Sequence, residues 1–402
     1  MGHQSPLIAT IAVGLAFALV GGYLAARLRL PPLVGYLLAG VAIGPFTPGF
    51  VADINLAPQL AEIGVILLMF GVGMHFSLRD LWAVRSIALL GALAQILVAT
   101  ALGVGIARVW GWSLGAGLVF GLALSVASTI VLLRALEGQG RLRSDVGRIA
   151  VGWLVVQDLV MVLAIVLLPA LATAFGGQPV HSGEVPVAGV WISLGLTVGK
   201  VVAFVALMLL VGARILPWLL KGVERTGSRE LFTLAAVTLA LGVAFGSAQL
   251  FGVSFALGAF FAGVVMHESD LSQRAASDLQ PLQDAFAVLF FVAVGMLFDP
   301  AILVRAPFQV LTVVGIIVLG KSLPALGIVL ALRRPLATGL TVAAALAQIG
   351  EFSFILAGLA VSLDLLDSEA QHLILAGALL SITLNPFLFA LASRIRPPQL
   401  AA

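Results

Sequence analysis

The sequence predicts an all-α polytopic membrane protein, and three observations lead to that fold class. Hydrophobic residues make up 61% of the chain and charged residues only 10%, with a mean hydropathy of +1.17. Soluble domains carry about 25% charged residues, so no aqueous fold could bury this much apolar surface. The apolar residues also fall into about thirteen segments of membrane-spanning length, and Lys and Arg alternate between the loops that follow them.

An apolar run of about 20 residues crosses the hydrocarbon core of a bilayer as a helix. The second, ninth and tenth runs are short, and Gly and Pro blur several boundaries, so the pattern also admits twelve or fourteen spans. In chain order, the predicted spans cover residues 7–26, 31–46, 57–76, 86–107, 113–134, 147–172, 188–213, 229–246, 250–266, 284–298, 308–332, 337–362 and 370–392.

The basic residues test this count independently. Seventeen of the 21 Lys and Arg residues follow odd-numbered spans and two follow even-numbered ones, while Lys200 and Lys321 lie inside spans. Cytoplasmic loops carry an excess of Lys and Arg. The alternation therefore predicts that the N-terminus is outside the cell and the C-terminus is cytoplasmic.

A weak internal repeat divides the chain into two halves. Three pairs of segments lie at, or within one residue of, the same offset of 222 residues: 72–76 with 294–298, 123–124 with 345–346, and 37–40 with 260–263. The paired spans differ in parity, so the two copies face opposite ways in the membrane. Inverted repeats place the substrate near the midplane, between discontinuous helices.

The repeat sets the predicted domain organisation. One membrane domain covers residues 1–396: a first six-helix repeat at about 7–172, a linker helix at about 188–213 and a second six-helix repeat at about 229–392. A short cytoplasmic tail, 397–402, follows. A lipid bilayer is the partner that this organisation requires, and nothing in it indicates nucleic-acid binding.

Asp158 is the strongest functional candidate. It lies near the middle of the sixth span, with apolar residues for about two turns on either side apart from Gln157. A carboxylate at that depth costs several kcal/mol unless it is protonated, paired or bound to a cation. A proton and a K⁺ or Na⁺ ion can then compete for the same oxygens. A structural Asp paired with a buried base remains the alternative.

Further polar residues occupy equivalent places in the fifth and twelfth spans. Irregular backbone at membrane depth is tolerated where it lines a cavity or is buried in protein, so we expect both helices to break and to cross there. The hydroxyl groups either contact the cation or bond back to their own helix. The residues concerned are Ser125, Ser128, Thr129, Gln348, Gly350, Glu351 and Ser353.

Crossing half-helices need compensating charge at their ends. We expect Glu351 near the positive N-terminal ends and Lys321 near the negative C-terminal ends, with Gln348 as a further charge-compensating or coupling residue. Lys321 is either a fixed structural charge or a direct participant in the chemistry.

Several other kinds of site are disfavoured. The chain has no Cys and only five His, so disulfides and thiolate metal sites are excluded, and no cofactor is predicted. Residues 111–115 fit the GxSxG pattern of a hydrolase. That pattern opens a membrane helix here, whereas a nucleophile elbow needs a strand-to-helix turn. We therefore expect no enzymatic activity.

Taken together, these residues resemble the Kef-type branch of the monovalent cation:proton antiporter-2 family, over essentially all 402 residues. The pair Gln157-Asp158 is the most specific match, because Gln-Asp in that family accompanies potassium efflux. The other similar segments are 60–65, 152–158, 254–263, 290–296 and 348–354.

The resemblance implies a residue-by-residue assignment. Asp158 becomes the ion-binding carboxylate, Gln157 its neighbouring ligand or orienter, and Lys321 the basic residue of the core. The family's fold has thirteen helices, divided between a mobile core bundle and a panel that forms a homodimer. A bacterial inner (plasma) membrane is the implied location, and alternating access with one cation exchanged for one proton is the implied mechanism.

Two features complicate the resemblance. Kef-type chains usually continue into a cytosolic nucleotide-binding domain, whereas this one stops after 394–398 and contains no GxGxxG. Either a regulatory domain or ancillary subunit is missing from this chain, or this member of the family lacks nucleotide gating. Some relatives also carry an acid in place of Gln157, so a Na⁺/H⁺ antiporter remains an alternative. A ligand-gated K⁺ channel-like protein and an organic-anion symporter are the more distant ones.

Overall fold

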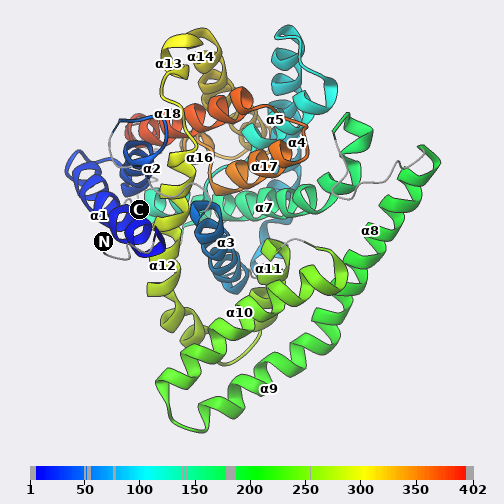
Figure 1. Cartoon of the computed structure of the whole chain (residues 1–402). Coiled ribbons are helices and arrows are strands. Elements are labelled where there is room, and N and C mark those ends of the chain that lie inside the picture. The colour runs from blue at the N-terminus through cyan, green and yellow to red at the C-terminus, as the bar shows by residue number, and fades with distance from the viewer. Residues whose placement is uncertain are drawn as a thin grey trace, which may run out of the picture. The chain divides into compact units, whose positions relative to one another are not determined.

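The predicted all-helical fold is confirmed. The computed structural model describes residues 6–48, 51, 56–75, 78–137, 140–141, 144–177, 187–253 and 255–394, and the regular structure of these residues is helical (Figure 1). Among them, eight helices are long and apolar enough to cross a membrane, and one pair of helices bent by 40° forms a further candidate span. Four shorter apolar helices, of 10–17 residues, accompany these spans.

The chain forms two compact units, which interleave along the sequence. Unit one combines 1–23, 35–77 and 184–297, and unit two combines 24–34, 78–183 and 298–402. The helices that fall mainly in unit one are α1 (Pro6–Arg27), α2 (Pro32–Ile43), α3 (Leu56–His75), α8 (Val187–Leu207), the π-helix η2 (Met208–Gly212), α9 (Ala213–Glu224), α10 (Arg229–Phe251), α11 (Phe255–His267) and α12 (Ser272–Met296).

Two helix crossings in unit one are built on glycine pairs. Gly73 of α3 meets Gly263 of α11, and Gly40 of α2 meets Gly295 of α12. A Cβ atom added to any of these four glycines would lie 2.0–2.2 Å from a backbone oxygen of the opposing helix. Backbones pack this closely in membranes only where side chains are absent, so these four positions require glycine.

Two helices of unit one are longer than the sequence predicted. The linker helix continues through η2 into α9 and ends at Glu224, and α12 begins at Ser272, twelve residues before the predicted span. Hydropathy marks the apolar part of a helix, whereas both extensions carry charged residues, Lys221 and Glu224 in α9 and Arg274 and Asp278 in α12. Ion pairs to neighbouring helices hold them: Arg274 bonds to Glu224 at 3.2 Å, and Arg229 to Asp278 at 3.3 Å.

The remaining helices build unit two. They are α4 (Leu78–Val109), α5 (Leu114–Ser125), α6 (Thr129–Glu137), α7 (Asp145–Leu171), the 3₁₀ turn η1 (Thr173–Phe175), α13 (Ile302–Arg305), α14 (Pro307–Gly315), the π-helix η3 (Ile316–Gly320), α15 (Lys321–Ala331), α16 (Leu336–Leu346), α17 (Glu351–Ser362) and α18 (Ser368–Ser393). A buried apolar cluster that includes Trp153 of α7 joins residues of α4, α6, α15, α16 and α18.

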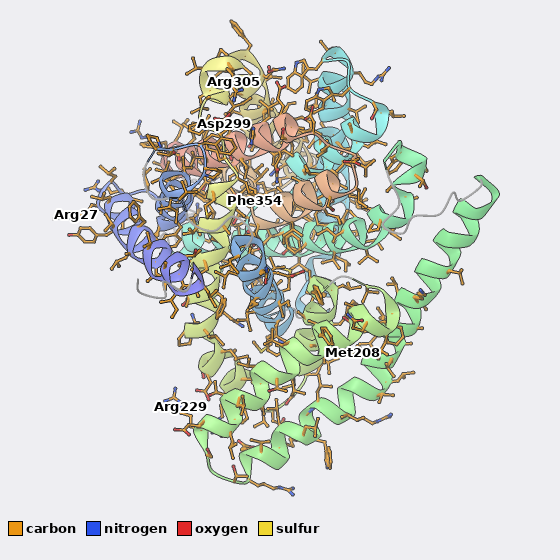
Figure 2. The ribbon with its side chains drawn as sticks, in the orientation of Figure 1. Arg27, Met208, Arg229, Asp299, Arg305 and Phe354 are labelled. Atoms are coloured by element: carbon orange, nitrogen blue, oxygen red, sulfur yellow. The ribbon has the colours of Figure 1, made fainter. Side chains whose placement is uncertain are left out.

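Local capping explains where several of these helices start. The Ser113 hydroxyl accepts a hydrogen bond from the Ala116 N–H at 3.0 Å and so caps α5, which gives the GxSxG pattern an ordinary structural role. Asp367 caps α18 in the same way, at 2.7 Å from the Ala370 N–H. Asp299, just before α13, forms an ion pair with Arg305, the last residue of that helix (Figure 2).

Candidate functional site

Two helical interruptions in unit two lie against each other. α5 ends at Ser125 and α6 begins at Thr129, while α16 ends at Leu346 and α17 begins at Glu351. The backbone N–H of Ser128 donates to Gln348 Oε1 at 2.9 Å, and Gln348 Nε2 donates back to the Ser128 carbonyl at 3.2 Å. The amide side chain of Gln348 thus accepts from and donates to the backbone of the same residue, as a paired peptide group would, and joins the two interruptions.

Asp158 faces the start of α6 with one carboxylate oxygen free. The side chain is only 4% exposed, and its Oδ2 accepts a hydrogen bond from the Thr129 hydroxyl at 3.1 Å. Its Oδ1 is buried and has no hydrogen-bond partner among the described residues. Asp158 is also absent from the five ion pairs found there. The free oxygen can therefore accept a proton or ligate a cation.

Glu351 occupies the first turn of α17, where the helix dipole favours a negative charge. Its Oε2 accepts a hydrogen bond from the Ser128 hydroxyl at 3.1 Å, and its Oε1 is buried without a partner in the described residues. The carboxyl group also acts electrostatically on Asp158. Two acids from different helices therefore share this buried region.

Lys321 lies at the α16 end of the interruption between α16 and α17, opposite Glu351. Its side chain is fully buried, and Nζ donates to the Gln348 carbonyl at 2.6 Å, just past the C-terminal end of α16. A helix C-terminus carries partial negative charge, so the ammonium group compensates it. The structure places Lys321 on a carbonyl; in the described residues it forms no ion pair with Asp158 or Glu351.

Two neutral side chains complete this end of α16. The Ser322 hydroxyl donates to the Ala343 carbonyl at 2.9 Å, and Asn385 Nδ2 of α18 donates to the Ala344 carbonyl at 2.8 Å. Buried carbonyls without partners are costly at membrane depth. Asn385, from the middle of α18, is thus a partner of the broken helix.

A π-helical segment turns Lys321 toward the core. The fully buried positions of this span recur every four residues, at 313, 317, 321, 325 and 329. An α-helix has 3.6 residues per turn, so a four-residue repeat drifts by about 40° at each step. The wider turn of η3 offsets part of that drift. Just after it, Pro324 has no N–H to donate to the carbonyl of Gly320.

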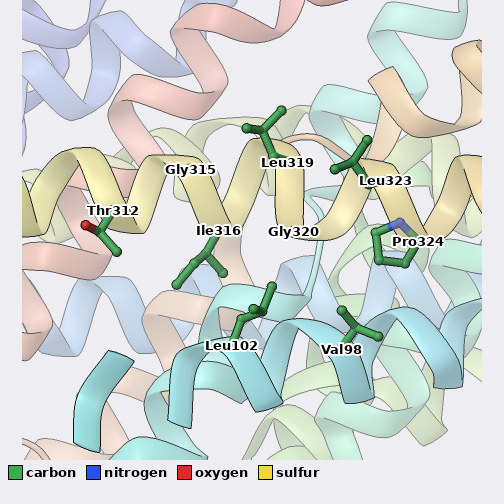
Figure 3. Close-up of a pocket in the computed structure, with 9 residues that line it drawn as sticks. All are labelled: Val98, Leu102, Thr312, Gly315, Ile316, Leu319, Gly320, Leu323 and Pro324. Carbon is green, nitrogen blue, oxygen red and sulfur yellow. The ribbon is translucent and has the colours of Figure 1, made fainter. Parts of the chain in front are cut away.

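A groove of about 420 Å³ borders η3 (Figure 3), and neither Asp158 nor Glu351 is among the residues that line it. Its walls come from α4 and from the span that runs through α14, η3 and α15. Its lining is almost wholly apolar and consists of Val98, Leu102, Thr312, Gly315, Ile316, Leu319, Gly320, Leu323 and Pro324. A groove without charged groups offers no ligand for a bare cation, so the ion site is not here.

Gln157 is held at both ends of its amide. Its Oε1 accepts a hydrogen bond from the Ala127 N–H at 3.1 Å, in the extended segment after α5, and its Nε2 donates to Gln95 Oε1. Gln95, on α4, also donates to the Ser125 carbonyl at 2.9 Å. Sequence reasoning missed Gln95. The available signal was an amide in the middle of the otherwise apolar span 86–107.

Three of the four hydroxyl groups predicted for this region have different partners. Thr129 contacts Asp158, Ser128 contacts Glu351, and Ser125 bonds back to the Leu122 carbonyl at 2.7 Å. The structure thus brings Thr129 and Asp158 together. The Ser353 hydroxyl is buried and has no partner among the described residues.

Gly350 lets the two interruptions approach, and a larger residue there should separate them. A Cβ atom at position 350 would lie 2.4 Å from Ser128 Cβ. We expect Gly350→Ala to destabilise the protein by about 3 kcal/mol, at the upper end of the cost of overpacking a core. Gly358 is the matched control on the same helix, because nothing lies within 4 Å of its added Cβ. Thermal unfolding of the two purified variants measures the difference; equal stability of the two would contradict this account.

The chain is similar to known transport proteins over nearly its whole length. Residues 15–392 match the family described as sodium/hydrogen exchanger, transmembrane. The chain is 60% identical over 394 residues to YbaL, a candidate cation/proton antiporter of Escherichia coli (strain K12), and the match covers 98% of this chain and 70% of YbaL.

Two further similarities are more distant. The chain is 34% identical over 387 residues to K(+) efflux antiporter 4 of Arabidopsis thaliana, which covers 96% of this chain but only 64% of the plant protein. Its fold matches the sodium proton antiporter MjNhaP1 from Methanocaldococcus jannaschii with a TM-score of 0.70. That match has 17% identity and covers 97% and 99% of the two chains.

Proposed function

Since the chain belongs to the sodium/hydrogen exchanger family, we propose that it exchanges one K⁺ ion for one proton at Asp158, in the direction of K⁺ efflux. The coarser assignment, cation/proton antiport, follows from the family, which is one of transporters. The resemblance to the Kef-type branch is confirmed by the family match and by the plant K⁺ efflux relatives.

The single observation that carries the proposal is the free oxygen of Asp158. Thr129 holds Oδ2, and Oδ1 is buried with no partner in the described residues. An ionised carboxylate at membrane depth is unfavourable unless something neutralises it. A proton on Oδ1 does so, and so does a dehydrated cation ligated by Oδ1 and neighbouring oxygens. The two cannot occupy that oxygen together, and this competition couples their movements.

Charge balance favours one-for-one exchange. Glu351 and Lys321 sit at opposite ends of the α16–α17 interruption, each compensating a helix dipole. Both can keep their charge throughout the cycle, and Gln157 is neutral. Asp158 is then the one group whose charge must be neutralised in turn by each ion, so no net charge crosses the membrane.

The repeat structure supports an alternating-access mechanism. The interruptions at 126–128 and 347–350 lie near the 222-residue offset found in the sequence. The same offset relates Gly73 to Gly295 and, within one residue, Gly40 to Gly263, so it maps one glycine crossing of unit one onto the other. We therefore retain the proposal of two inverted six-helix repeats joined by a linker helix, with thirteen spans in all. Such repeats expose a central site to each side in turn.

The setting of this exchanger is proposed in the same way. The alternation of Lys and Arg supports an external N-terminus and a cytoplasmic C-terminus, in a bacterial inner membrane. The family resemblance supports a homodimer, and residues 1–396 as a single membrane domain. A cytosolic regulatory partner would act on this domain from the cytoplasmic side.

Exchange assays on the purified protein in liposomes test the proposal. We expect K⁺ and Rb⁺ gradients to drive proton movement, reported by a pH-sensitive dye, at least about tenfold better than Na⁺ or Li⁺ at equal concentration. A current measurement on membrane-adsorbed proteoliposomes should detect no net charge per cycle. A Na⁺ preference would select the Na⁺/H⁺ alternative. Cation flux without proton counter-movement would select a channel.

A further inference from the structure

Gln95 has three partners, and two of them can play only one role. The Trp153 indole N–H can only donate, and the Ser125 carbonyl can only accept. Gln95 Oε1 accepts from Trp153 Nε1 at 3.2 Å, and Gln95 Nε2 donates to the Ser125 carbonyl at 2.9 Å. Turning the amide over would set donor against donor and acceptor against acceptor. Its orientation is therefore fixed by chemistry.

That orientation determines the group required at position 157. Gln95 presents its oxygen, so the nearer atom of residue 157 must be a donor, which Gln157 Nε2 supplies. On the other side, the Ala127 N–H requires an acceptor, which Gln157 Oε1 supplies at 3.1 Å. Residues 95 and 157 are both fully buried, so water cannot replace either bond. The amide of Gln157 matches both demands.

An ionised acid at position 157 fits neither arrangement of these partners. A carboxylate has acceptors only, so one of its oxygens would face Gln95 Oε1. Reversing Gln95 to relieve that contact would break its bonds to Trp153 and Ser125 together. Buried polar groups left unpaired in this way destabilise the fold, and more so when one of them is charged. A neutral acid, with one hydroxyl and one carbonyl, reproduces the amide pattern and is tolerated.

We infer that Gln95 is a positioning residue of the exchange site, which holds Gln157 as a neutral orienter of the α5–α6 interruption and so restricts ion exchange to the single carboxylate of Asp158. The inference rests on the proposed function and assigns Gln157 to support of the broken helix. The Gln157 oxygen accepts the Ala127 N–H, and this bond holds it against the backbone between α5 and α6. These hydrogen bonds form a relay, which runs from Trp153 through Gln95 and Gln157 to the backbone N–H of Ala127.

The substitution Gln157→Glu separates this role from that of a cation ligand. Asp158 adjoins position 157, and Glu351, on α17, acts electrostatically on Asp158. Both acids oppose a further negative charge at position 157. Lys321 is hydrogen-bonded to the Gln348 carbonyl and does not offset that charge. We expect the variant to keep one-for-one exchange, with no net current and an apparent cation KM within about threefold of the parent. If residue 157 ligates the cation, an acid there should bind the cation more tightly and carry a second proton, so that each cycle moves net charge. A measured current per cycle would overturn the inference.

Variants at position 95 test the relay independently. Gln95→Met removes all three bonds of Gln95, and we expect the turnover per folded protein to fall about tenfold, with a change in apparent cation KM. Adding Gln157→Met should reduce turnover little further, because residues that act through one another give non-additive losses. Thr100→Val is the matched control on α4: the Thr100 hydroxyl is buried without a partner among the described residues, so its loss should leave turnover and KM unchanged.

The outcomes distinguish failure of the role inferred for Gln95 from failure of the proposed exchange function. Fully additive losses at 95 and 157, or a Gln95→Met variant whose folded fraction has the parental turnover and KM, would overturn the relay alone. Exchange that persists in Asp158→Asn would overturn the proposed function whatever the variants at 95 do.

Discussion

Replacing Asp158 with Asn is expected to abolish exchange, by at least about 100-fold, while the protein folds normally. An amide cannot take up and release a proton, so the competition between H⁺ and cation ends. The Asn oxygen can still accept the Thr129 hydroxyl, and its NH₂ group takes the place of the oxygen that has no partner among the described residues. The substitution also removes a buried charge. We therefore expect thermal stability equal to, or above, that of the parent.

The measurement is cation-driven proton movement in proteoliposomes, with thermal unfolding of the same preparation. Asp145→Asn is the matched control, because Asp145 lies on the same helix, is exposed and pairs with Arg148 at the surface. Exposed ion pairs of this kind contribute about 0–1 kcal/mol, so this control should exchange normally. Exchange by Asp158→Asn above the level of empty liposomes would remove Asp158 from the mechanism.

The two helical interruptions could be predicted from sequence because polar residues at membrane depth have few explanations. Ser128 in the fifth span and Gln348 and Glu351 in the twelfth are out of place in hydrocarbon, and they lie near one repeat offset. The structure places both interruptions at these residues. The charges at the helix ends followed from the dipoles. Glu351 lies in the first turn of α17, and Lys321 at the carbonyl after α16, as expected.

Side-chain partners could not be predicted in the same way. Ser125, Ser128 and Thr129 look equivalent in sequence, yet only Thr129 reaches Asp158, because the backbone leaves α5 and re-enters a helix within these residues. Gln95, on α4, depends on groups from two other segments, the end of α5 and α7, which no local pattern brings together. The start of α12 is invisible to hydropathy because most of its side chains are polar or charged. Ion pairs join it to neighbouring helices, and its few apolar side chains, Ala275 and Leu279, are buried.

Loss of the Lys321 charge should lower both the stability of the protein and its exchange rate, without changing the number of protons exchanged for each cation. Lys321→Met leaves the Gln348 carbonyl without its donor and the C-terminal end of α16 without a compensating charge. Bonds from charged donors to buried groups contribute about 1.5–3 kcal/mol, so we expect a loss of stability of about 3 kcal/mol and a fall in exchange of about 100-fold. Lys321→Gln, which keeps an N–H donor, should retain part of both.

The net charge that crosses the membrane in each transport cycle decides between the two roles that the sequence left open for Lys321. If Lys321 releases a proton during transport, the parent protein moves net charge and Lys321→Gln alters that charge. If Lys321 only compensates the helix end, current is absent in the parent and in every active variant. Compensation also predicts a partial rescue. Removing the nearby negative charge with Glu351→Gln should recover some of the stability lost in Lys321→Met, because the pair then leaves no unbalanced charge in the interruption. A strictly additive loss in the double variant would contradict this rescue and would show that the two residues act separately, each on its own helix end.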